Sequence, residues 1–272
     1  MKYIYGLLTL TLVLILFIGF SFPDKFLHVI ACNVGQGDAI LITLGQTQIL
    51  VDGGPNDKVL DCLSKFLPFW DKEIEMVILT HPDADHFTGL VNVFKNYKID
   101  KFVGNQTDNS SDQRYQLLEK QVGSSGTKVI IPYKGMKLGN SLLYLDILNP
   151  SPDSNFDKDN NFSVVFELHY KNFKALFTGD MEYKDVPLDS INFLEPVNYL
   201  KVPHHGSKNG LTPEFLDIIN PQIAVISVGK NSYGHPDKSI LNMLEAKGIK
   251  IERTDLKGDI QLVSDGTSWW LK

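Results

Sequence analysis

The sequence predicts one α/β domain that is built from two β-sheets with helices on their outer faces. Two observations support this fold class. Short apolar, β-branched runs bounded by glycine or proline recur along the chain and are typical of strands, and stretches with helical spacing of apolar residues lie between them. Both halves of the chain show this pattern, and no long linker, low-complexity tract or short-period repeat separates them. A chain of 272 residues can hold both halves in a single domain.

The strands and helices can be assigned in order from this pattern. Residues 75–80 form a continuous apolar run that is typical of a strand buried on both faces. Residues 151–161 are polar and predict a loop, and the last three apolar runs, at 249–253, 259–264 and 268–272, predict edge strands. The other expected strands are 27–34, 39–44, 47–51, 127–132, 142–148, 162–170, 173–179, 198–203 and 222–228, and the expected helices are 57–67, 86–95, 112–121, 213–219 and 237–247.

The N-terminal segment differs from the rest of the chain. Residues 3–22 carry no charge, and twenty helical residues at about 1.5 Å each span a hydrocarbon core of roughly 30 Å. We therefore expect residues 1–23 to be a membrane anchor. A cleavable signal sequence is the rival interpretation, although no A-x-A-like site follows the apolar run. We expect a single-pass protein of the cell membrane with its domain, residues 24–272, outside the cytoplasm; the flanking charges encode this orientation only weakly.

The overall charge and the cysteines limit the function only loosely. The net charge of −6 argues against a surface-wide field for polyanions, but it leaves room for a local one. Cys32 and Cys62 are either a disulfide pair or two buried thiols. The residues VIAC before Asn33 resemble a lipidation site, but they also lie within an expected strand that cleavage would cut in half.

Histidines and carboxylates gather directly after the expected strands. Each such group alone is compatible with a polar turn or a helix cap. Together, at strand ends that can converge on one rim, they predict a pocket for divalent cations, because crowded carboxylates and imidazoles need a neutralising charge. The groups are His81, Asp83, Asp85 and His86 in THPDADH, Asp180 in FTGD, His204 and His205 in PHHGS, and His235 in SYGHP.

These motifs resemble those of the metallo-β-lactamase superfamily. With NVGQGDAILI (33–42), VDGGP (51–55) and SYGHP (232–236), the chain is similar to the hydrolase domain of the ComEC-type DNA-uptake proteins from about residue 27 onward. The resemblance implies a four-layer αββα sandwich with a two-metal site at the edges of the sheets.

The resemblance also implies a role for each matching residue. His81 would bind the first metal ion, Asp85 and His86 the second, and Asp180 would bridge the two ions. His205 aligns with the histidine of a P-x-H-G motif, and His235 would be a general acid or a phosphate contact. The remaining assignments are Asp83 as a ligand or a water-orienting group, His204 and Asn161 (or Asn160) as ligands or supporting groups, Lys201, Ser207, Asn231 and Tyr233 (with Lys208) as substrate contacts, and Asp38 and Asp52 as structural residues near the site.

Three departures from the superfamily pattern bear on the metal. Asp83 stands where most members have a histidine, and no histidine lies near Asn161, where another ligand is usual. Asn33 stands where relatives carry an aspartate. The first metal position would therefore be rich in oxygen ligands, which favours Mn²⁺ or Mg²⁺ over Zn²⁺, although Zn²⁺ stays open.

The expected function is a membrane-anchored phosphodiesterase or nuclease that acts on DNA or nucleotides. Two metal ions would activate a water molecule, and Asp85 would position it. A single predicted span cannot form a channel, so any link to DNA uptake would require partner proteins of the uptake machinery. Two alternatives remain: an acyl hydrolase for β-lactams or lactones on the same fold, and a non-catalytic, membrane-tethered binding module.

Overall fold

The computed structural model describes residues 23–104, 111–151, 159–185 and 194–272, together with Tyr5, Leu7 and Thr11. The predicted anchor at residues 3–22 and most of the predicted loop at 151–161 lie outside these ranges. Within the described parts of the chain, no helix has the length and apolar character that a membrane crossing requires.

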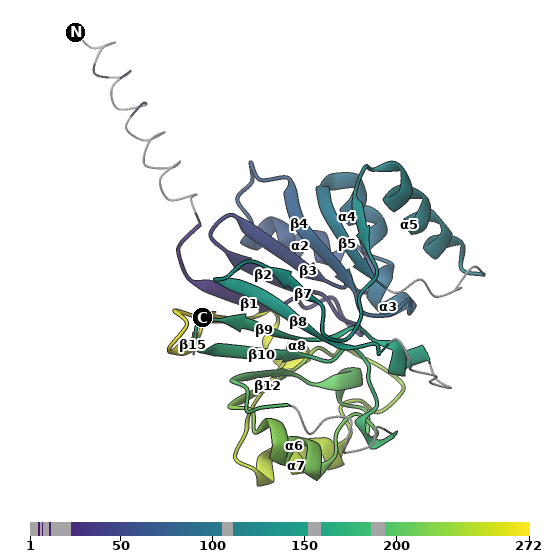
Figure 1. Ribbon diagram of the computed structural model, residues 1–272, viewed down its shortest axis with the longest axis vertical. Coiled ribbons are helices and arrows are strands. Elements are labelled where there is room, and N and C mark those ends of the chain that lie inside the picture. The colour runs from purple at the N-terminus through teal and green to yellow at the C-terminus, as the bar shows by residue number, and fades with distance from the viewer. Residues whose placement is uncertain are drawn as a thin grey trace.

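Two β-sheets form the centre of the molecule (Figure 1). In the first sheet β1, β2, β3 and β14 are joined by antiparallel pairing, whereas β3, β4, β5 and β6 run parallel to one another. Its strand order is β15 (Trp269–Leu271), β14 (Ile260–Ser264), β1 (Leu27–Ala31), β2 (Ile40–Leu44), β3 (Thr47–Val51), β4 (Glu73–Leu79), β5 (Lys98–Gly104) and β6 (Lys128–Ile130).

The second sheet is also mixed. Its strands β10 to β13 are parallel, and β7 to β10 are antiparallel. The strand order is β13 (Lys250–Arg253), β12 (Ile223–Ile226), β11 (Tyr199–Lys201), β10 (Phe173–Phe177), β9 (Val165–Tyr170), β8 (Leu143–Asn149) and β7 (Lys137–Gly139).

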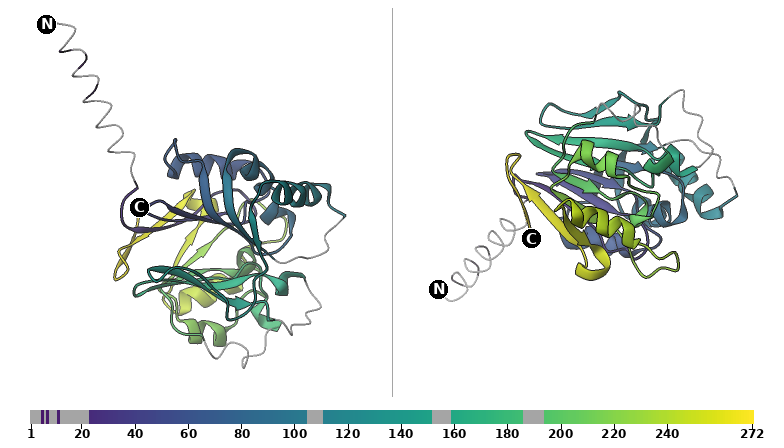
Figure 2. Two further views of the ribbon diagram at one scale, coloured as in Figure 1. Left: turned by 45° about the horizontal axis from the view of Figure 1, so that its top comes forward. Right: turned by 90° about the horizontal axis from the view of Figure 1, so that it is seen from below.

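Three apolar cores hold four layers together. The central core fills the space between the two sheets, with Phe166, Phe177 and Tyr199 among its largest side chains. A second core lies between the first sheet and helices α2 (Lys58–Phe66), α4 (Leu90–Asn96) and α5 (Gln113–Ser124). A third lies between the second sheet and helices α6 (Pro213–Ile219) and α7 (Lys238–Ala246). The layers follow the order helix, sheet, sheet, helix, as Figures 1 and 2 show, so the predicted αββα sandwich is confirmed.

The helix and strand predictions hold in most places, but the short helix α8 (Thr254–Lys257) was not expected, and the structure differs in three other places. The expected helix at 86–95 is two helices, α3 (Ala84–Phe87) and α4, because the Gly89 N–H donates to the Gly54 carbonyl instead of to the preceding helical turn. Strand β7 was not expected, since KLG is too short to show an alternation. The prediction that residues 259–264 form an edge strand is wrong: β14 pairs with both β1 and β15, so it lies inside the first sheet.

A disulfide joins Cys32 to Cys62, with a Cα–Cα distance of 5.9 Å. It links the chain just after β1 to helix α2, and both residues are buried in the second core. A lipidated Cys32 is incompatible with this bond. A cross-link over a sequence separation of 30 residues stabilises the fold by about 3.5 kcal/mol in the chain-entropy view.

Candidate metal centre

The functional side chains converge because the strands that carry them end at the same rim. Strands β3 and β4 are parallel, and so are β10 and β11, so Asp52, His81, Asp180 and His205 follow neighbouring strand ends. Asp38 precedes β2, which runs antiparallel to β3 and therefore begins at this rim. Figure 1 shows α3, which carries Asp85 and His86, at the end of the sandwich opposite β15.

Four side chains surround one position. The Asp180 Oδ2 atom lies 3.4 Å from His86 Nε2 and 3.4 Å from His205 Nε2, and His205 Nε2 lies 3.3 Å from Asp85 Oδ2. Ligand atoms 2.1 Å from a common ion are separated by about 3.0 Å in octahedral and about 3.4 Å in tetrahedral geometry. The four side chains are therefore spaced as ligands of a single cation.

The three buried histidines direct one nitrogen each toward Asp180. His81, His86 and His205 have Nε2 atoms that are buried and lack a hydrogen-bond partner among the described residues. An imidazole nitrogen without a partner costs free energy in a protein interior unless a ligand satisfies it. The convergence of three such atoms around Asp180, whose Oδ1 is also without a hydrogen bond, fits a metal ion.

Hydrogen bonds on the opposite ring nitrogens fix the orientation of these histidines. His86 Nδ1 contacts Asp52 Oδ2 at 2.9 Å, and His205 Nδ1 contacts the Ser227 carbonyl oxygen at 2.9 Å. Each acceptor requires the proton on Nδ1, so the neutral ring presents its lone pair at Nε2. Such outer contacts are the usual way in which a protein orients metal-binding histidines.

Thr80 extends the same arrangement to His81. The Thr80 hydroxyl donates to Asp52 Oδ2 at 2.8 Å, so it can accept the proton of His81 Nδ1 at 3.0 Å. Asp52 also accepts the Thr80 backbone N–H at 2.8 Å. One buried carboxylate thus orients two histidines, which is the structural role predicted for Asp52.

The position predicted for the first metal ion lies on the His81 side of Asp180 and has fewer protein donors than the position between His86 and His205. His81 Nε2 lies 4.0 Å from Asp180 Oδ2 and 3.6 Å from Asp83 Oδ2, and the Asp83 side chain is 46% exposed. Asn161 is buried, but its side-chain oxygen accepts the Glu182 backbone N–H at 3.1 Å. Asn161 therefore supports the loop after Asp180, and the first metal position combines one imidazole with carboxylates.

Lys201 lies inside the protein, where its ammonium contacts Asp38 Oδ2. Its Nζ atom also donates to the Gly179 carbonyl at 3.1 Å and lies 3.6 Å from Asp180 Oδ1. The expectation that Lys201 contacts substrate is not supported by this geometry. Lys201 instead holds Asp38 and Asp180 in place from behind, while Asp38 Oδ1 lies 3.4 Å from His205 Nδ1.

The outer edge of the site is formed by His204, His235 and Tyr233. His204 lies beside the metal position: its Nε2 is 3.8 Å from Asp180 Oδ2, and its Nδ1 is 3.3 Å from Glu182 Oε1. The His235 ring lies 5.6 Å from the His204 ring and is stacked on Tyr233, which is 75% exposed. Contact between these rings and a substrate stays a prediction.

The other predicted substrate contacts have structural tasks. Asn231 uses both ends of its amide within its own loop, since its Nδ2 donates to the Gly229 and His235 carbonyls and its Oδ1 accepts two backbone N–H groups. Ser207 is buried, and its Oγ accepts the Asn209 backbone N–H at 3.5 Å. Lys208 is exposed and follows the PHHGS motif directly, and its contact with substrate stays a prediction.

The carboxylates and imidazoles shift one another's pKa. Burial alone would lower the pKa of His205, but the carboxylates of Asp180 and Asp38 outweigh burial and raise it to about 10. The same balance, with Asp180 and Asp52 as the main charges, raises the pKa of His86. Burial would raise the pKa of Asp180, but His205 and His86 hold it well below its usual range. The site therefore has a strong negative field that attracts cations.

Backbone strain is concentrated in the same loops. Asp52, His204 and His205 adopt positive φ angles of 57°, 49° and 52°. Such conformations cost about 1 kcal/mol or more each in non-glycine residues, and they persist where the surrounding structure enforces them for function. Gly37 allows a close approach: a Cβ atom there would lie 2.2 Å from the Asp85 carbonyl oxygen.

Sequence reasoning missed several supporting residues. Thr80 and Ser227 fix histidine rings, and Ser163 Oγ accepts the Asp180 backbone N–H at 3.1 Å. Glu182 orients His204. Thr80 and Glu182 lie within two residues of a predicted ligand, which is a usable signal. Ser163 and Ser227 act through contacts that only the fold creates.

Comparison with known proteins agrees with this geometry. The sequence pattern of the metallo-β-lactamase superfamily matches residues 32–230, which include the whole ligand set. The chain belongs to this superfamily. Among solved structures, the metallo-β-lactamase fold protein YhfI from Bacillus subtilis has a TM-score of 0.59 at 13% identity, covering 90% of this chain and all of YhfI. At that identity the likeness concerns the fold alone.

Curated relatives of this superfamily member include competence proteins. ComE operon protein 3 of Bacillus subtilis is 31% identical over 193 residues, which are 70% of this chain and 24% of that protein. Competence protein ComA of Neisseria gonorrhoeae is 27% identical over 253 residues, which are 88% of this chain and 32% of ComA. The chain thus spans about a quarter to a third of the length of these relatives.

Proposed function

We propose that this protein is a two-metal phosphodiesterase or nuclease that acts on DNA or nucleotides outside the cytoplasm. The observation that carries the proposal is the donor set: three buried histidine nitrogens without other partners converge on Asp180, with Asp85 and Asp83 at the solvent side. The choice of a phosphodiester over an acyl substrate is supported by the competence relatives and by the carboxylate-rich first metal position.

The site residues divide between binding cations and managing the reaction. His81, Asp83 and Asp180 would hold one divalent ion, and Asp85, His86, His205 and Asp180 the other. Two divalent cations, when bound, lower the pKa of a shared water to near neutrality and stabilise the charge that develops on the phosphoryl oxygens. Carboxylate-rich sites favour Mn²⁺ or Mg²⁺, and Zn²⁺ is the alternative to be tested.

Asp85 and His235 would act on the substrate itself. The Asp85 side chain is 35% exposed, so its carboxylate can orient a nucleophilic water from the open side of the site. Burial lowers the pKa of His235, and nearby His204 and His205 lower it further. Because the neutral ring then prevails at neutral pH, His235 is better suited to donate a hydrogen bond to a phosphate oxygen than to act as the general acid.

The proposal includes a membrane anchor at residues 3–22. The uncharged length of this segment supports it. The disulfide between Cys32 and Cys62 supports a domain outside the cytoplasm, because such bonds persist in oxidising compartments. A partnership with a DNA-uptake channel is part of the same proposal, and the competence relatives support it.

The test begins with the full chain, purified and stripped of metal. Mn²⁺, Mg²⁺ and Zn²⁺ are added back singly, and cleavage of bis-p-nitrophenyl phosphate, single-stranded DNA and nitrocefin is measured. We expect phosphodiester cleavage with Mn²⁺ or Mg²⁺. Turnover of nitrocefin with Zn²⁺, without phosphodiester cleavage, would show that the protein is an acyl hydrolase.

Matched variants separate the metal site from general effects. Asp180→Ala and His205→Ala should lose both bound metal and activity, whereas His169→Ala, on the outer face of the second sheet, should keep both. His235→Ala should lower turnover more than metal content. If His235→Ala loses metal instead, the residue is a ligand and not a substrate contact.

A further inference from the structure

All three tryptophans of the chain lie at strand ends opposite the metal centre: Trp70 precedes the start of β4, and Trp269 and Trp270 begin β15 beside the start of β1. Trp70 is 42% exposed and follows Phe69, which is 69% exposed, in the loop before β4. Trp270, 37% exposed and next to Trp269 on the edge strand β15, packs edge-on against Phe26 with ring centroids 5.4 Å apart. Large aromatic side chains are rarely left in water in such a group.

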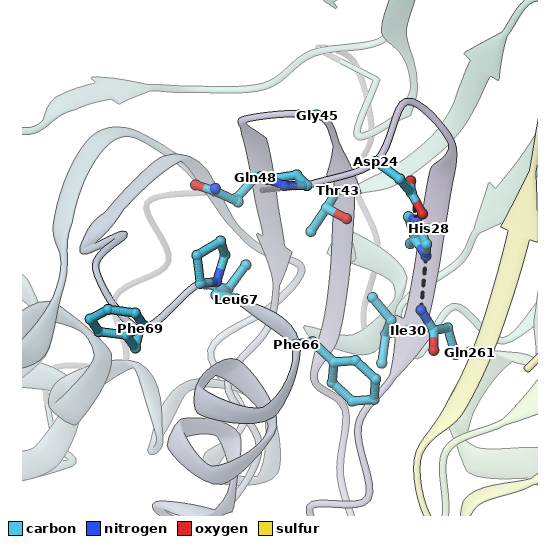
Figure 3. Close-up of a pocket in the computed structure, with 12 residues that line it drawn as sticks. Asp24, His28, Ile30, Thr43, Gly45, Gln48, Phe66, Leu67, Phe69 and Gln261 are labelled. Atoms are coloured by element: carbon cyan, nitrogen blue, oxygen red, sulfur yellow. Dashed lines mark hydrogen bonds and ion pairs between the residues drawn. The ribbon is translucent and has the colours of Figure 1, made fainter. Parts of the chain in front are cut away.

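A cavity of about 360 Å³ lies between Phe69 and the residues that lead into β1, Pro23 and Asp24. Figure 3 shows Asp24, His28 and Gln261 on one side of this cavity and Leu67 and Phe69 on the other. His28 is held between its neighbours, since its Nε2 lies 2.8 Å from Asp24 Oδ1 and its Nδ1 lies 2.8 Å from Gln261 Nε2. The surface therefore combines apolar rings with a polar inner wall. We call Phe26, Phe69, Trp70 and Trp270 the aromatic face.

The aromatic face lies beside the point at which the domain meets the uncharged segment, since Phe69 shares the cavity with Pro23 and Phe26 is three residues beyond Pro23. Pro23 lines the same cavity and directly follows residues 3–22. Three exposed lysines adjoin the aromatic face in the sequence, namely Lys25, Lys72 and Lys272. Tryptophan and phenylalanine rings with lysines beside them are typical of surfaces in the interfacial layer of a bilayer, where rings enter the head-group region and ammonium groups meet lipid phosphates.

We propose that the aromatic face rests on the membrane and inserts its rings into the interfacial layer. The inference builds on the proposed anchor at residues 3–22, which would hold this end of the domain against the lipid. A bilayer is the occupant that the position favours, because the face is continuous with the segment that would enter the bilayer. A protein partner at the same face is the alternative outcome of the test.

The orientation has a consequence for the substrate. Strand β4 runs from Glu73, next to the aromatic face, to Leu79, next to the metal-binding loop. Six residue steps of about 3.3 Å separate these ends by roughly 20 Å. With the aromatic face on the lipid, the metal centre points away from the membrane into water, where a highly charged phosphodiester can reach it.

Tryptophan fluorescence tests the inference directly because all three tryptophans lie at the end of the domain that carries the aromatic face. The full-length protein is reconstituted into phosphatidylcholine vesicles that carry bromine near the head-group end or near the middle of the acyl chains. We expect the emission to fall with bromine near the head groups and to fall less with bromine at the bilayer centre. Flotation of the same vesicles reports anchoring separately.

A pair of variants makes the result specific. The double substitution Phe26→Ser and Phe69→Ser keeps all three tryptophans and should reduce the quenching, whereas Ile131→Ser, at an equally exposed apolar residue after β6, should not. Protein that floats without being quenched overturns the aromatic-face inference and leaves the anchor intact; a protein partner is then the better explanation. Protein that does not float overturns the anchor.

Discussion

Asp52→Asn is the perturbation that tests the metal centre most closely. Asp52 accepts hydrogen bonds from the Thr80 backbone N–H, the Thr80 hydroxyl and His86 Nδ1, at 2.8, 2.8 and 2.9 Å. Asparagine keeps the size of the side chain and one oxygen acceptor. Its amide group, however, brings a donor to a position where His86 and Thr80 also donate.

The size of the loss in metal affinity depends on which hydrogen bonds of Asp52 survive in the Asp52→Asn variant. If the asparagine oxygen keeps the Thr80 N–H, its NH₂ group faces the Nδ1–H of His86. The ring then relieves the conflict by moving its proton to Nε2, where it blocks the lone pair that would bind metal. Removing an outer partner of a metal-binding histidine typically lowers metal affinity 10- to 100-fold, or about 1.4 to 2.7 kcal/mol. Loss of a charge-assisted hydrogen bond also costs roughly 1.5–3 kcal/mol of folding stability.

Two measurements separate these effects. Competition with a chelating dye gives the metal affinity, and urea unfolding of the metal-free protein gives the stability. We expect Asp52→Asn to weaken metal binding at least tenfold at a temperature where the variant remains folded. Wild-type affinity in a folded Asp52→Asn variant would refute the claim that Asp52 orients His86 for metal binding.

Three further changes test other parts of the fold. Gly37→Ala places a methyl group against the Asp85 carbonyl, so we expect a loss of at least about 2 kcal/mol in urea unfolding, together with weaker metal binding. Cys62→Ser removes the disulfide to Cys32 and should lower the free energy of unfolding by about 3.5 kcal/mol; an unchanged value would mean that the bond constrains little. Burial raises the pKa of Glu75 in the folded protein. The stability that depends on a protonated Glu75 is therefore present at low pH and is lost as the pH rises through the raised pKa of the folded state. Glu75→Gln should therefore raise the melting temperature at pH 7 more than at pH 4.

Much of the fold was predictable because its strands carry clear patterns. Strand β8, for example, alternates buried and half-buried residues along its whole length, and helix α6 begins at Pro213 after the Thr212 cap and ends at Ile219, as predicted. The position of β14 was not predictable, since an apolar strand near the end of a chain gives no sign of which strands it will pair with. Its pairing with β1 brings together residues more than 200 positions apart.

The candidate ligands were predictable for a related reason. Carboxylates and histidines at strand ends stand out in the sequence because they interrupt apolar runs. The tasks of the polar residues beside them were harder to predict, since lysine and asparagine next to a phosphate-binding motif usually suggest substrate contact. Only the fold shows that Lys201 is buried against Asp38 and that the Asn231 amide is used within its own loop.

The buried lysine helps to explain how the site tolerates its own charge. Asp38, Asp52 and Asp180 are all buried within one rim, so their negative charges need positive partners during folding. The Lys201 ammonium contacts Asp38 and lies 3.6 Å from Asp180, so it supplies a permanent positive charge before any cation binds. Burial opposes the charge of Lys201, but the carboxylates of Asp38 and Asp180 outweigh burial and raise its pKa, so the ammonium persists at any working pH. Among the described residues, the partly exposed carboxylates of Asp83 and Asp85 have no such buried lysine beside them and are left for the metal ions. Cations therefore exchange on the solvent side of the site, whereas the charges of the buried side are balanced when the protein folds.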